Sequence, residues 1–166
     1  MNHQTLNLRL NQLYQNTIDI GHFELGYRFT EEEYNTLPKE DLDEILPLND
    51  SGTALLDKVI EDLGFRKPYG LEETQFESII ELNLRTQNET QVREWLFELD
   101  ISPKEQVFLL WDAWGSAITT YGNLIKYYDD FYYPVSDDLM IIDKSLKWGI
   151  YFFHEEYIYF GKRASM

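Results

Sequence analysis

The residues best suited to chemistry in this sequence are carboxylates and tyrosines gathered in two short segments, 127–138 and 154–156. The first segment places a pair of aspartates on either side of a turn at Pro134, and in the second two glutamates follow His154. Carboxylate oxygens are the ligands that hard cations such as Mg²⁺ prefer. A metal-dependent hydrolase is therefore one hypothesis for these acids, which are Asp129, Asp130, Asp137, Asp138, Glu155 and Glu156.

Other catalytic and metal-binding chemistries find little support in the residue types. A zinc site needs Cys or His ligands, and the chain has no Cys and only His3, His22 and His154. There is no Gly-x-Ser-x-Gly motif, no glycine-rich phosphate loop, and nothing that fixes the carboxyl separation of a glycosidase. Neighbouring residues on a strand point to opposite faces, so only one member of each acidic pair can converge on an ion. We therefore predict no enzymatic activity, no metal and no cofactor.

The same segments are well suited to protein recognition. Tyrosine combines an apolar ring with a polar hydroxyl, and Tyr and Trp are enriched at the positions that dominate interface energies. A surface dense in Tyr and Asp would suit a basic protein. The residues that we predict to contact such a partner are Asp129, Asp130, Tyr132, Tyr133, Asp137, Asp138, Glu155 and Glu156. The acidic stretch 31–44 is an equally good docking face by composition.

The charge of the chain favours a basic partner and argues against other classes. The net charge is −16, from 14 basic and 30 acidic residues. A field of this sign repels nucleic acid and attracts cationic proteins, and solubility alone is a simpler explanation for it. The sequence has no Cys, no apolar run of about 20 residues and no signal-peptide pattern at its start. We therefore expect a cytoplasmic protein that contacts neither a membrane nor nucleic acid.

Hydrophobic spacing predicts that residues 1–100 are mainly helical. Apolar residues recur every three or four positions in four segments, as is typical of amphipathic helices. These segments are 5–15, 56–63, 71–86 and 89–99. Gly64 fits a left-handed helix C-cap, and Asn88 with Gln91 fits a capping box.

Three further elements are predicted between residues 22 and 46. Apolar residues alternate with polar ones over 22–29, which indicates a strand. Thr30 followed by Glu33 predicts a short helix that ends before Pro38. Pro38 then opens another helix, with Leu42 on its apolar face.

Residues 101–166 hold 16 of the 26 aromatic residues and the expected sheet. Residues 103–114 fit either a helix or a buried strand. We favour a strand, because the strands predicted after it need a central partner and a two-stranded hairpin alone is marginal in water. Ser116 is a candidate N-cap for a helix, which we predict to run to about residue 131 and to end before Pro134. The remaining segments predict three strands and a tail, at 139–142, 148–153, 157–160 and 161–166.

The predicted fold is α+β, in one domain that spans residues 1–166. Its helical first part, residues 1–100, packs with a small, mostly antiparallel sheet from the aromatic-rich second part, residues 101–166.

The second part of the chain resembles a known class of bacterial proteins. The resemblance rests on the segments 111–112, 127–138, 154–156 and 160–161, together with Trp148. These residues are similar to the C-terminal half of small acidic immunity proteins, which are encoded beside the toxins of contact-dependent inhibition and other polymorphic toxin systems. The resemblance covers about 50 residues, and the first hundred residues match no pattern of the class.

The resemblance implies a protein without enzymatic activity. Such a protein binds the toxic C-terminal domain of its cognate toxin and blocks the active site or the access of substrate. Many of these toxins are nucleases, which are basic because they bind phosphates. An inhibitor of a nuclease can place carboxylates where phosphates would lie, and an excess of negative charge agrees with that mechanism.

Overall fold

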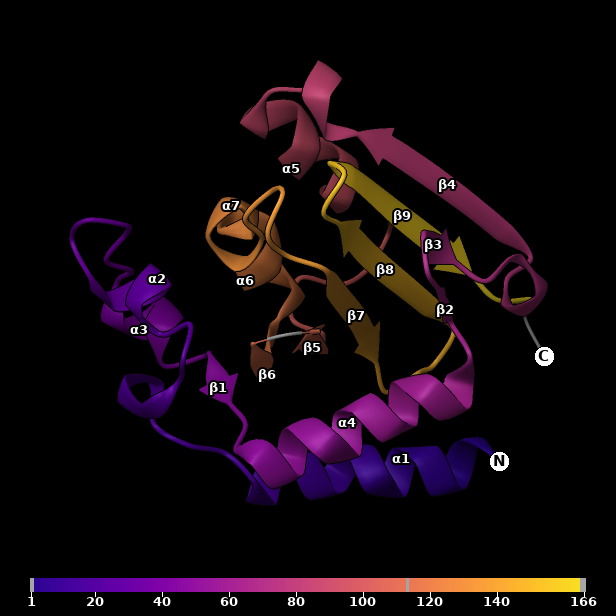
Figure 1. Cartoon of the computed structure of the whole chain (residues 1–166), viewed down its shortest axis with the longest axis horizontal. Helices are drawn as coiled ribbons and strands as arrows, with labels where there is room; N and C mark the ends of the chain where they lie inside the picture. Colours follow the sequence, from indigo (N-terminus) through magenta and orange to yellow (C-terminus); the bar gives the residue numbers. More distant parts are fainter. Residues whose placement is uncertain (1, 113, 165–166) are drawn as a thin grey trace.

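A seven-stranded sheet in the order β1-β6-β5-β7-β8-β9-β4 organises the chain, and each of its strand pairings is antiparallel (Figure 1). The computed structural model describes residues 2–112 and 114–164. The strands of the sheet are β1 Leu46–Pro47, β4 Ser78–Asn83, β5 Gln106–Trp111, β6 Gly115–Thr120, β7 Leu139–Asp143, β8 Trp148–Phe153 and β9 Tyr157–Lys162. A separate hairpin pairs β2 Arg66–Lys67 with β3 Gly70–Leu71.

Helices cover both faces of this sheet. The α-helices are α1 His3–Gln12, α2 Tyr27–Thr30, α3 Lys39–Leu42, α4 Asp50–Leu63, α5 Glu89–Phe97, α6 Tyr121–Lys126 and α7 Tyr128–Phe131. Short 3-10 helices lie at η1 Leu13–Gln15, η2 Ile20–His22, η3 Glu73–Gln75 and η4 Leu84–Thr86. None of the helices within 2–112 and 114–164 is long and apolar enough to cross a bilayer.

The central strand β5 explains why its sequence is apolar throughout. Val107, Leu109 and Trp111 belong to the hydrophobic cluster on one face of the sheet, and Phe108 and Leu110 belong to the cluster on the other face. All five side chains are buried. A strand covered on both faces needs a continuous apolar run rather than an alternating one.

The helices α1 and α4 lie side by side along one face (Figure 1). Helix α4 begins where the side chain of Asn49 accepts a hydrogen bond from the amide of Gly52 at 2.8 Å, and it ends at Gly64 in the left-handed conformation, with φ 65°. Leu56, Val59 and Ile60 face the sheet and are buried. The C-cap predicted from Gly64 is therefore confirmed.

The opposite face is covered by α5, α6, α7 and the segment 20–45. The capping box of α5 is present, since Asn88 and Gln91 each accept a hydrogen bond from the other's amide at 2.9 Å. Trp111 is buried in this cluster, and its indole nitrogen donates a hydrogen bond of 2.8 Å to the carbonyl oxygen of Phe131. This bond ties the centre of the sheet to α7.

The α+β class is confirmed, and so are several predicted elements. The helices near the chain start, at 56–63 and at 89–99 are present, as are the strands at 139–142, 148–153 and 157–160. The preference for a strand within 103–114 is confirmed by β5, and Pro38 does precede a short helix, α3. The sheet is larger than expected, because β1 and β4 come from the first hundred residues.

Four predicted elements are wrong. Residues 22–29 form 3-10 and α turns rather than a strand, and no helix follows Thr30 because α2 ends there. Residues 71–86 form β3, η3, β4 and η4 rather than one helix. Strand β6 occupies 115–120, so the helix that we predicted from Ser116 begins only at Tyr121. The predicted tail is also shorter than expected, since β9 extends to Lys162.

Gly161 on β9 fills a position where no larger residue fits. A Cβ atom there would lie 2.7 Å from two ring carbons of Phe76. We expect Gly161→Ala to lower the free energy of unfolding by about 1–3 kcal/mol, the usual cost of overpacking. Gly21→Ala is the matched control, because nothing lies within 4 Å of its Cβ position. Urea unfolding of both variants measures the difference, and equal stabilities would contradict the expectation.

Candidate functional site

The structure divides the predicted partner-contact residues between the interior and the surface, and three of them, Asp129, Tyr132 and Glu156, contribute to the lining of one pocket of about 670 Å³. Asp137 is fully buried, and its carboxylate accepts hydrogen bonds from both terminal nitrogens of Arg28, at 2.6 and 3.2 Å, and from the amide of Tyr133 at 2.8 Å. Tyr132 is also buried, with its hydroxyl donating to the carbonyl oxygen of Phe153. A docked protein would not touch these two side chains, so their prediction as contact residues is corrected to a structural role.

Arg28 connects several of these residues from the interior. Its side chain is 3% exposed and its guanidinium lies 3.8 Å from the ring centroid of Tyr133. Burial disfavours the charged form of Arg28, but hydrogen bonds to Asp137 and Tyr27 outweigh this and raise its pKa. Tyr133 is half-buried and lies against the outside of this pair. Sequence could not reveal the contact, because 109 residues separate Arg28 from Asp137.

The remaining predicted acids mostly have local partners. Asp129 pairs with Arg93 at 3.0 Å and Asp130 accepts from Asn35 at 2.8 Å. Asp138 accepts from the ring of His154 at 3.0 Å, and Glu156 pairs with Arg85 at 2.7 Å. Glu155 is exposed. Within residues 2–112 and 114–164, no three Asp, Glu or His side chains are placed to hold a metal ion.

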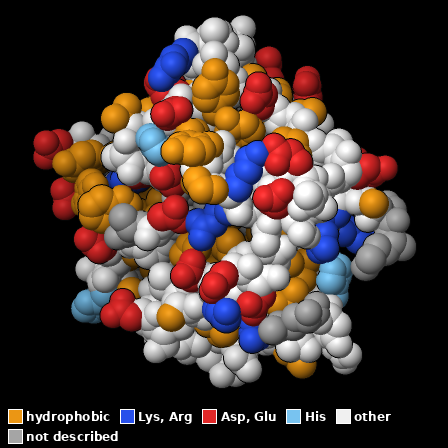
Figure 2. All heavy atoms as spheres, turned by 45° about the vertical axis from the view of Figure 1, so that its right-hand side comes forward, with side chains coloured by type: hydrophobic (Ala, Val, Ile, Leu, Met, Phe, Trp, Pro, Cys, Tyr) orange, Lys and Arg blue, Asp and Glu red, His pale blue; other side chains and the backbone are white. Residues whose placement is uncertain are grey.

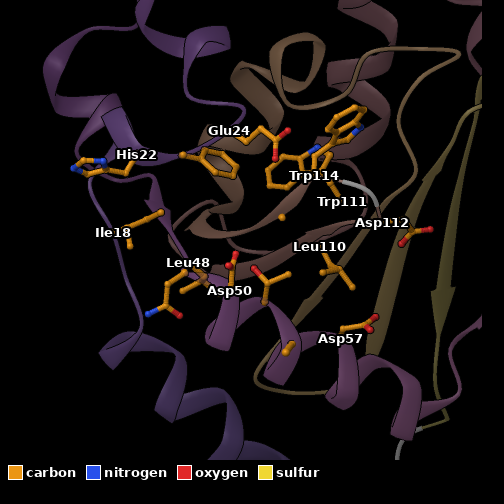
Figure 3. Close-up of a pocket in the computed structure, with 15 residues that line it drawn as sticks. Ile18, His22, Glu24, Leu48, Asp50, Asp57, Leu110, Trp111, Asp112 and Trp114 are labelled. Atoms are coloured by element: carbon orange, nitrogen blue, oxygen red, sulfur yellow. The ribbon is translucent and has the colours of Figure 1, made fainter.

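A different set of acids converges at a cleft between three segments of the chain (Figure 3). The cleft has a volume of about 490 Å³ and lies between the loop 18–24, the first turns of α4 and the β5–β6 turn. Four carboxylates line it, and no Lys or Arg is among the described residues that do so. We call it the acidic cleft; its carboxylates belong to Glu24, Asp50, Asp57 and Asp112.

Each wall of the acidic cleft is fixed by a structural element. Helix α4 supplies Asp50 in its first turn and Asp57 two turns later, so both residues line the cleft from the same helix (Figure 3). Gly115, with φ 121°, allows the sharp reversal from β5 into β6 that presents Trp114. An L-residue is strained at such an angle.

Aromatic rings form the apolar part of the cleft. Phe23 and Trp111 are buried behind it, with ring centroids 5.7 Å apart, whereas Trp114 is 39% exposed. An exposed indole beside carboxylates can bind a cation both through its ring face and through the neighbouring negative charge. The cleft can therefore accept the ammonium or guanidinium group of a Lys or Arg side chain.

One cation already lies at the margin of the cleft. Arg66 pairs with Asp112 and also approaches Asp57 at 3.4 Å. It contacts only these two of the four carboxylates in the ion pairs of the described residues, which leaves Glu24 and Asp50 at the other end. The negative charge of the cleft is therefore only partly neutralised within the chain.

Burial raises the pKa of Asp112, with the charges of Asp138 and Asp57 adding to the shift and Arg66 opposing it. A carboxyl with a raised pKa in the folded state binds its proton more readily there than when unfolded. The free energy of unfolding then falls as pH rises from the unfolded pKa through the folded one. This slope should be absent from Asp112→Asn.

We expect carbon-13 NMR of the Asp112 carboxyl to show a titration midpoint above 3.8, the ordinary value. Arg66→Gln should raise the midpoint further, because it removes the opposing charge. A midpoint at or below 3.8, or a fall in Arg66→Gln, would contradict the assignment.

Sequence reasoning missed the residues of the acidic cleft. They come from segments around residues 18–24, 48–57 and 110–115, which no periodicity or motif links. The one available signal was Gly115 soon after an apolar run, which indicates a turn at the end of a strand.

A comparison of the chain with protein-family models, with curated proteins and with solved structures finds no match.

Proposed function

We propose that this chain is an immunity protein that binds and neutralises a basic toxic domain, and that the acidic cleft receives a basic side chain of that domain. The proposal extends the resemblance of residues 111–161 to immunity proteins of polymorphic toxin systems. A toxin of the nuclease class fits best, because such enzymes present Lys and Arg to phosphates. The inhibitor would occupy those groups and exclude the nucleic acid.

The observation that carries the proposal is the composition of the acidic cleft. Four carboxylates and the exposed ring of Trp114 share one cavity, and Arg66 pairs with only two of these carboxylates. Glu24 and Asp50 have no basic partner in the ion pairs of the described residues. A cationic side chain from a partner would be attracted to these carboxylates, which favours the complex.

The segment 19–44 next to the cleft adds to the attraction. It carries nine acidic residues and two basic ones, and one of the two, Arg28, is buried against Asp137. Glu31, Glu32 and Glu33 are exposed in the loop after α2, and Tyr34 beside them is 47% exposed. The segment 19–44 therefore contributes to both surfaces: it contains the docking face predicted at 31–44, and it supplies Glu24 to the acidic cleft. Long-range attraction of this kind accelerates association with a basic protein.

The hydrolase alternative gains no comparable support. Most of the acids on which it was based pair with arginines or other polar groups, as described above, and within residues 2–112 and 114–164 no three of them are placed to hold a metal ion. The second hypothesis therefore has no specific observation in its favour.

A growth assay tests the proposal. The C-terminal domain encoded by the reading frame directly upstream is expressed under an inducible promoter in a bacterial host, with or without this chain. We expect growth arrest from that domain alone and recovery when this chain is co-expressed. Co-purification of the two proteins should be weakened as salt is raised, because exposed charges contribute to the contact.

Two results would overturn the proposal. The first is an upstream domain that arrests growth without being rescued by this chain. The second is rescue without formation of a complex, which would indicate an indirect effect. An unrelated acidic protein of similar net charge serves as the control for non-specific electrostatic binding.

A further inference from the structure

We propose that β4 is a docking edge, to which an extended basic segment of a partner protein adds as a further antiparallel strand. This surface lies apart from the acidic cleft and is formed by different residues. The inference goes beyond the immunity function, because it holds for any basic partner with an extended segment.

The two edges of the sheet differ in how they are protected. The edge at β1 is two residues long and contains Pro47, and both features block the pairing of another strand. The edge at β4 is six residues long, with the sequence Ser-Ile-Ile-Glu-Leu-Asn, and has neither Pro nor Lys. Among the described residues β4 pairs with β9 alone. Proteins usually protect a long edge strand with Pro or charged side chains, and the charge within β4 is that of Glu81, which leaves the edge open to a strand of opposite charge.

The backbone groups that would accept a new strand can be assigned from the existing pairing. The amide of Leu84 donates to the carbonyl oxygen of Glu156 at 2.9 Å, which is the direction of β9. Backbone groups of successive residues alternate in direction along an antiparallel strand. Those of Ile79, Glu81 and Asn83 therefore point outward. The carbonyl of Asn83 accepts from the hydroxyl of Thr86 at 3.0 Å, which leaves Ile79 and Glu81 for the partner.

A groove lies beside this edge and would hold side chains of the added strand. Its volume is about 450 Å³, and Ile79 and Glu81 of β4 form part of its wall together with Tyr159 of β9. Tyr69, from the β2–β3 turn, lines the groove and is 74% exposed. Lys67 also lines the groove, but it is paired with Glu73. Every second side chain of an added strand would point toward this groove, where tyrosine rings and Glu81 could bind an aliphatic or basic group.

The opposite face of the edge is also available to a partner. Ile80 is 48% exposed at the centre of β4, and alternation places it on the face opposite Ile79. Figure 2, which brings forward the side where β4 lies in Figure 1, shows hydrophobic side chains exposed among charged ones. An added strand would bury Ile80 and gain contacts on both faces.

Charge selects the class of partner. Glu77 and Glu81 are exposed on or beside the edge, and each copy of the chain carries −16. Two copies would repel each other at moderate salt, whereas a strand with Lys or Arg at alternate positions would be attracted. Like charges at the edge thus disfavour a second copy and favour a basic segment.

The test uses a synthetic peptide and the full nitrogen-15-labelled protein. The peptide is capped Lys-Val-Lys-Tyr-Lys-Val-Lys, which alternates basic and apolar side chains as a strand would. We expect NMR shifts on titration that are confined to residues 67–83 and 157–162, with slower solvent exchange of the Ile79 and Glu81 amides. The same peptide with N-methyl groups at alternate positions cannot form the ladder, and should bind at least about tenfold more weakly.

Two variants separate the backbone from the charge. Glu81→Pro removes an outward amide that the fold does not use, and should weaken binding at least about tenfold. Glu81→Gln keeps the amide and should weaken binding less. The N-methyl peptide keeps the test valid even where the proline variant fails to fold.

Several outcomes would overturn the inference. They are no shifts at about millimolar peptide, shifts at the acidic cleft instead, and equal binding of the N-methyl peptide. A peptide with Glu in place of Lys that binds equally well would remove the charge selection. A dimer in sedimentation that Glu81→Pro abolishes would assign the edge to a second copy. Failure of the growth rescue leaves this test unaffected, because the peptide replaces the toxin.

Discussion

Asp137→Ala is expected to lower the free energy of unfolding by about 3–5 kcal/mol, because it leaves the charge of Arg28 buried without its partner. Arg28 and Asp137 are 3% and 0% exposed, and their closest atoms are 2.6 Å apart. The Nε atom of Arg28 is buried without a hydrogen-bond partner among the described residues. The two hydrogen bonds from its terminal nitrogens both end on Asp137, and Tyr27 adds a smaller contribution.

A double variant distinguishes a lost charge partner from lost packing. Arg28→Met combined with Asp137→Leu removes both charges and keeps much of the volume, so it should be more stable than Asp137→Ala alone. Glu155→Ala, at an exposed position, should change stability by less than about 0.5 kcal/mol. Urea unfolding of the three variants gives the comparison. A double variant as unstable as Asp137→Ala would show that the loss came from packing or from the lost hydrogen bond of the Tyr133 amide, and not from the unpaired charge of Arg28.

The second large effect is expected at the acidic cleft. Glu24→Gln combined with Asp50→Asn removes the two cleft carboxylates that Arg66 does not contact, and we expect it to weaken binding of the basic toxin domain by about 10- to 100-fold. Trp114→Ala should weaken binding by a similar factor, through loss of the ring that faces the incoming cation. Isothermal titration calorimetry at two salt concentrations measures both changes.

The matched control removes the same charge elsewhere. Glu94→Gln combined with Glu98→Gln changes two exposed acids at the end of α5. It removes the same amount of negative charge as the cleft double variant but leaves the cleft intact. Its effect on binding should be no more than a few-fold and should vanish at high salt. Equal losses in the two double variants would assign binding to the overall field rather than to the cleft. Loss in neither would remove the cleft from the interface.

Sequence predicted the elements whose local signals agree with their burial. Helix α5 has a capping box as well as an apolar stripe, and β7 to β9 are short apolar runs between turns. The segment 22–29 was wrongly predicted as a strand because its alternating apolar residues Phe23, Leu25 and Phe29 are all buried, as they would be in a strand. They are buried by consecutive tight turns, in which Gly26 approaches the carbonyl oxygen of Ile20 so closely that a Cβ atom would lie 2.3 Å away. Alternating burial does not require a strand.

The helix predictions for the segments 71–86 and 116–131 were wrong for a different reason. Ile79 and Ile80 fit a helical stripe, yet in β4 they point to opposite faces, and an edge strand can accept both. Ser116 could cap a helix, but its backbone instead pairs with β5 and its hydroxyl lies 2.7 Å from that of Thr53. The partner of β4 is β9, far along the chain, whereas that of β6 is β5 in the same hairpin, and helical spacing within a segment records neither partner.

The candidate site was less predictable than the fold. The density of acidic residues predicted a contact site that includes 127–138. Four of the acids proposed as contacts instead form ion pairs within the chain, with Arg28, Arg93, Arg85 and His154. Pairing is set by side chains 16 to 109 residues away, so composition could not distinguish matched acids from unmatched ones. The cleft acids are spread over three segments that only the fold brings together.

The strand order has a consequence for synthesis on the ribosome. Strands β1 and β4 emerge within the first hundred residues, but their partners β6 and β9 are made later, and β9 only at Tyr157–Lys162. Until then β4 has no neighbour to pair with, so the nascent chain must wait with apolar residues uncovered. Residues 1–100 carry 21 acidic and 8 basic residues, and their mutual repulsion would keep the incomplete chain from aggregating.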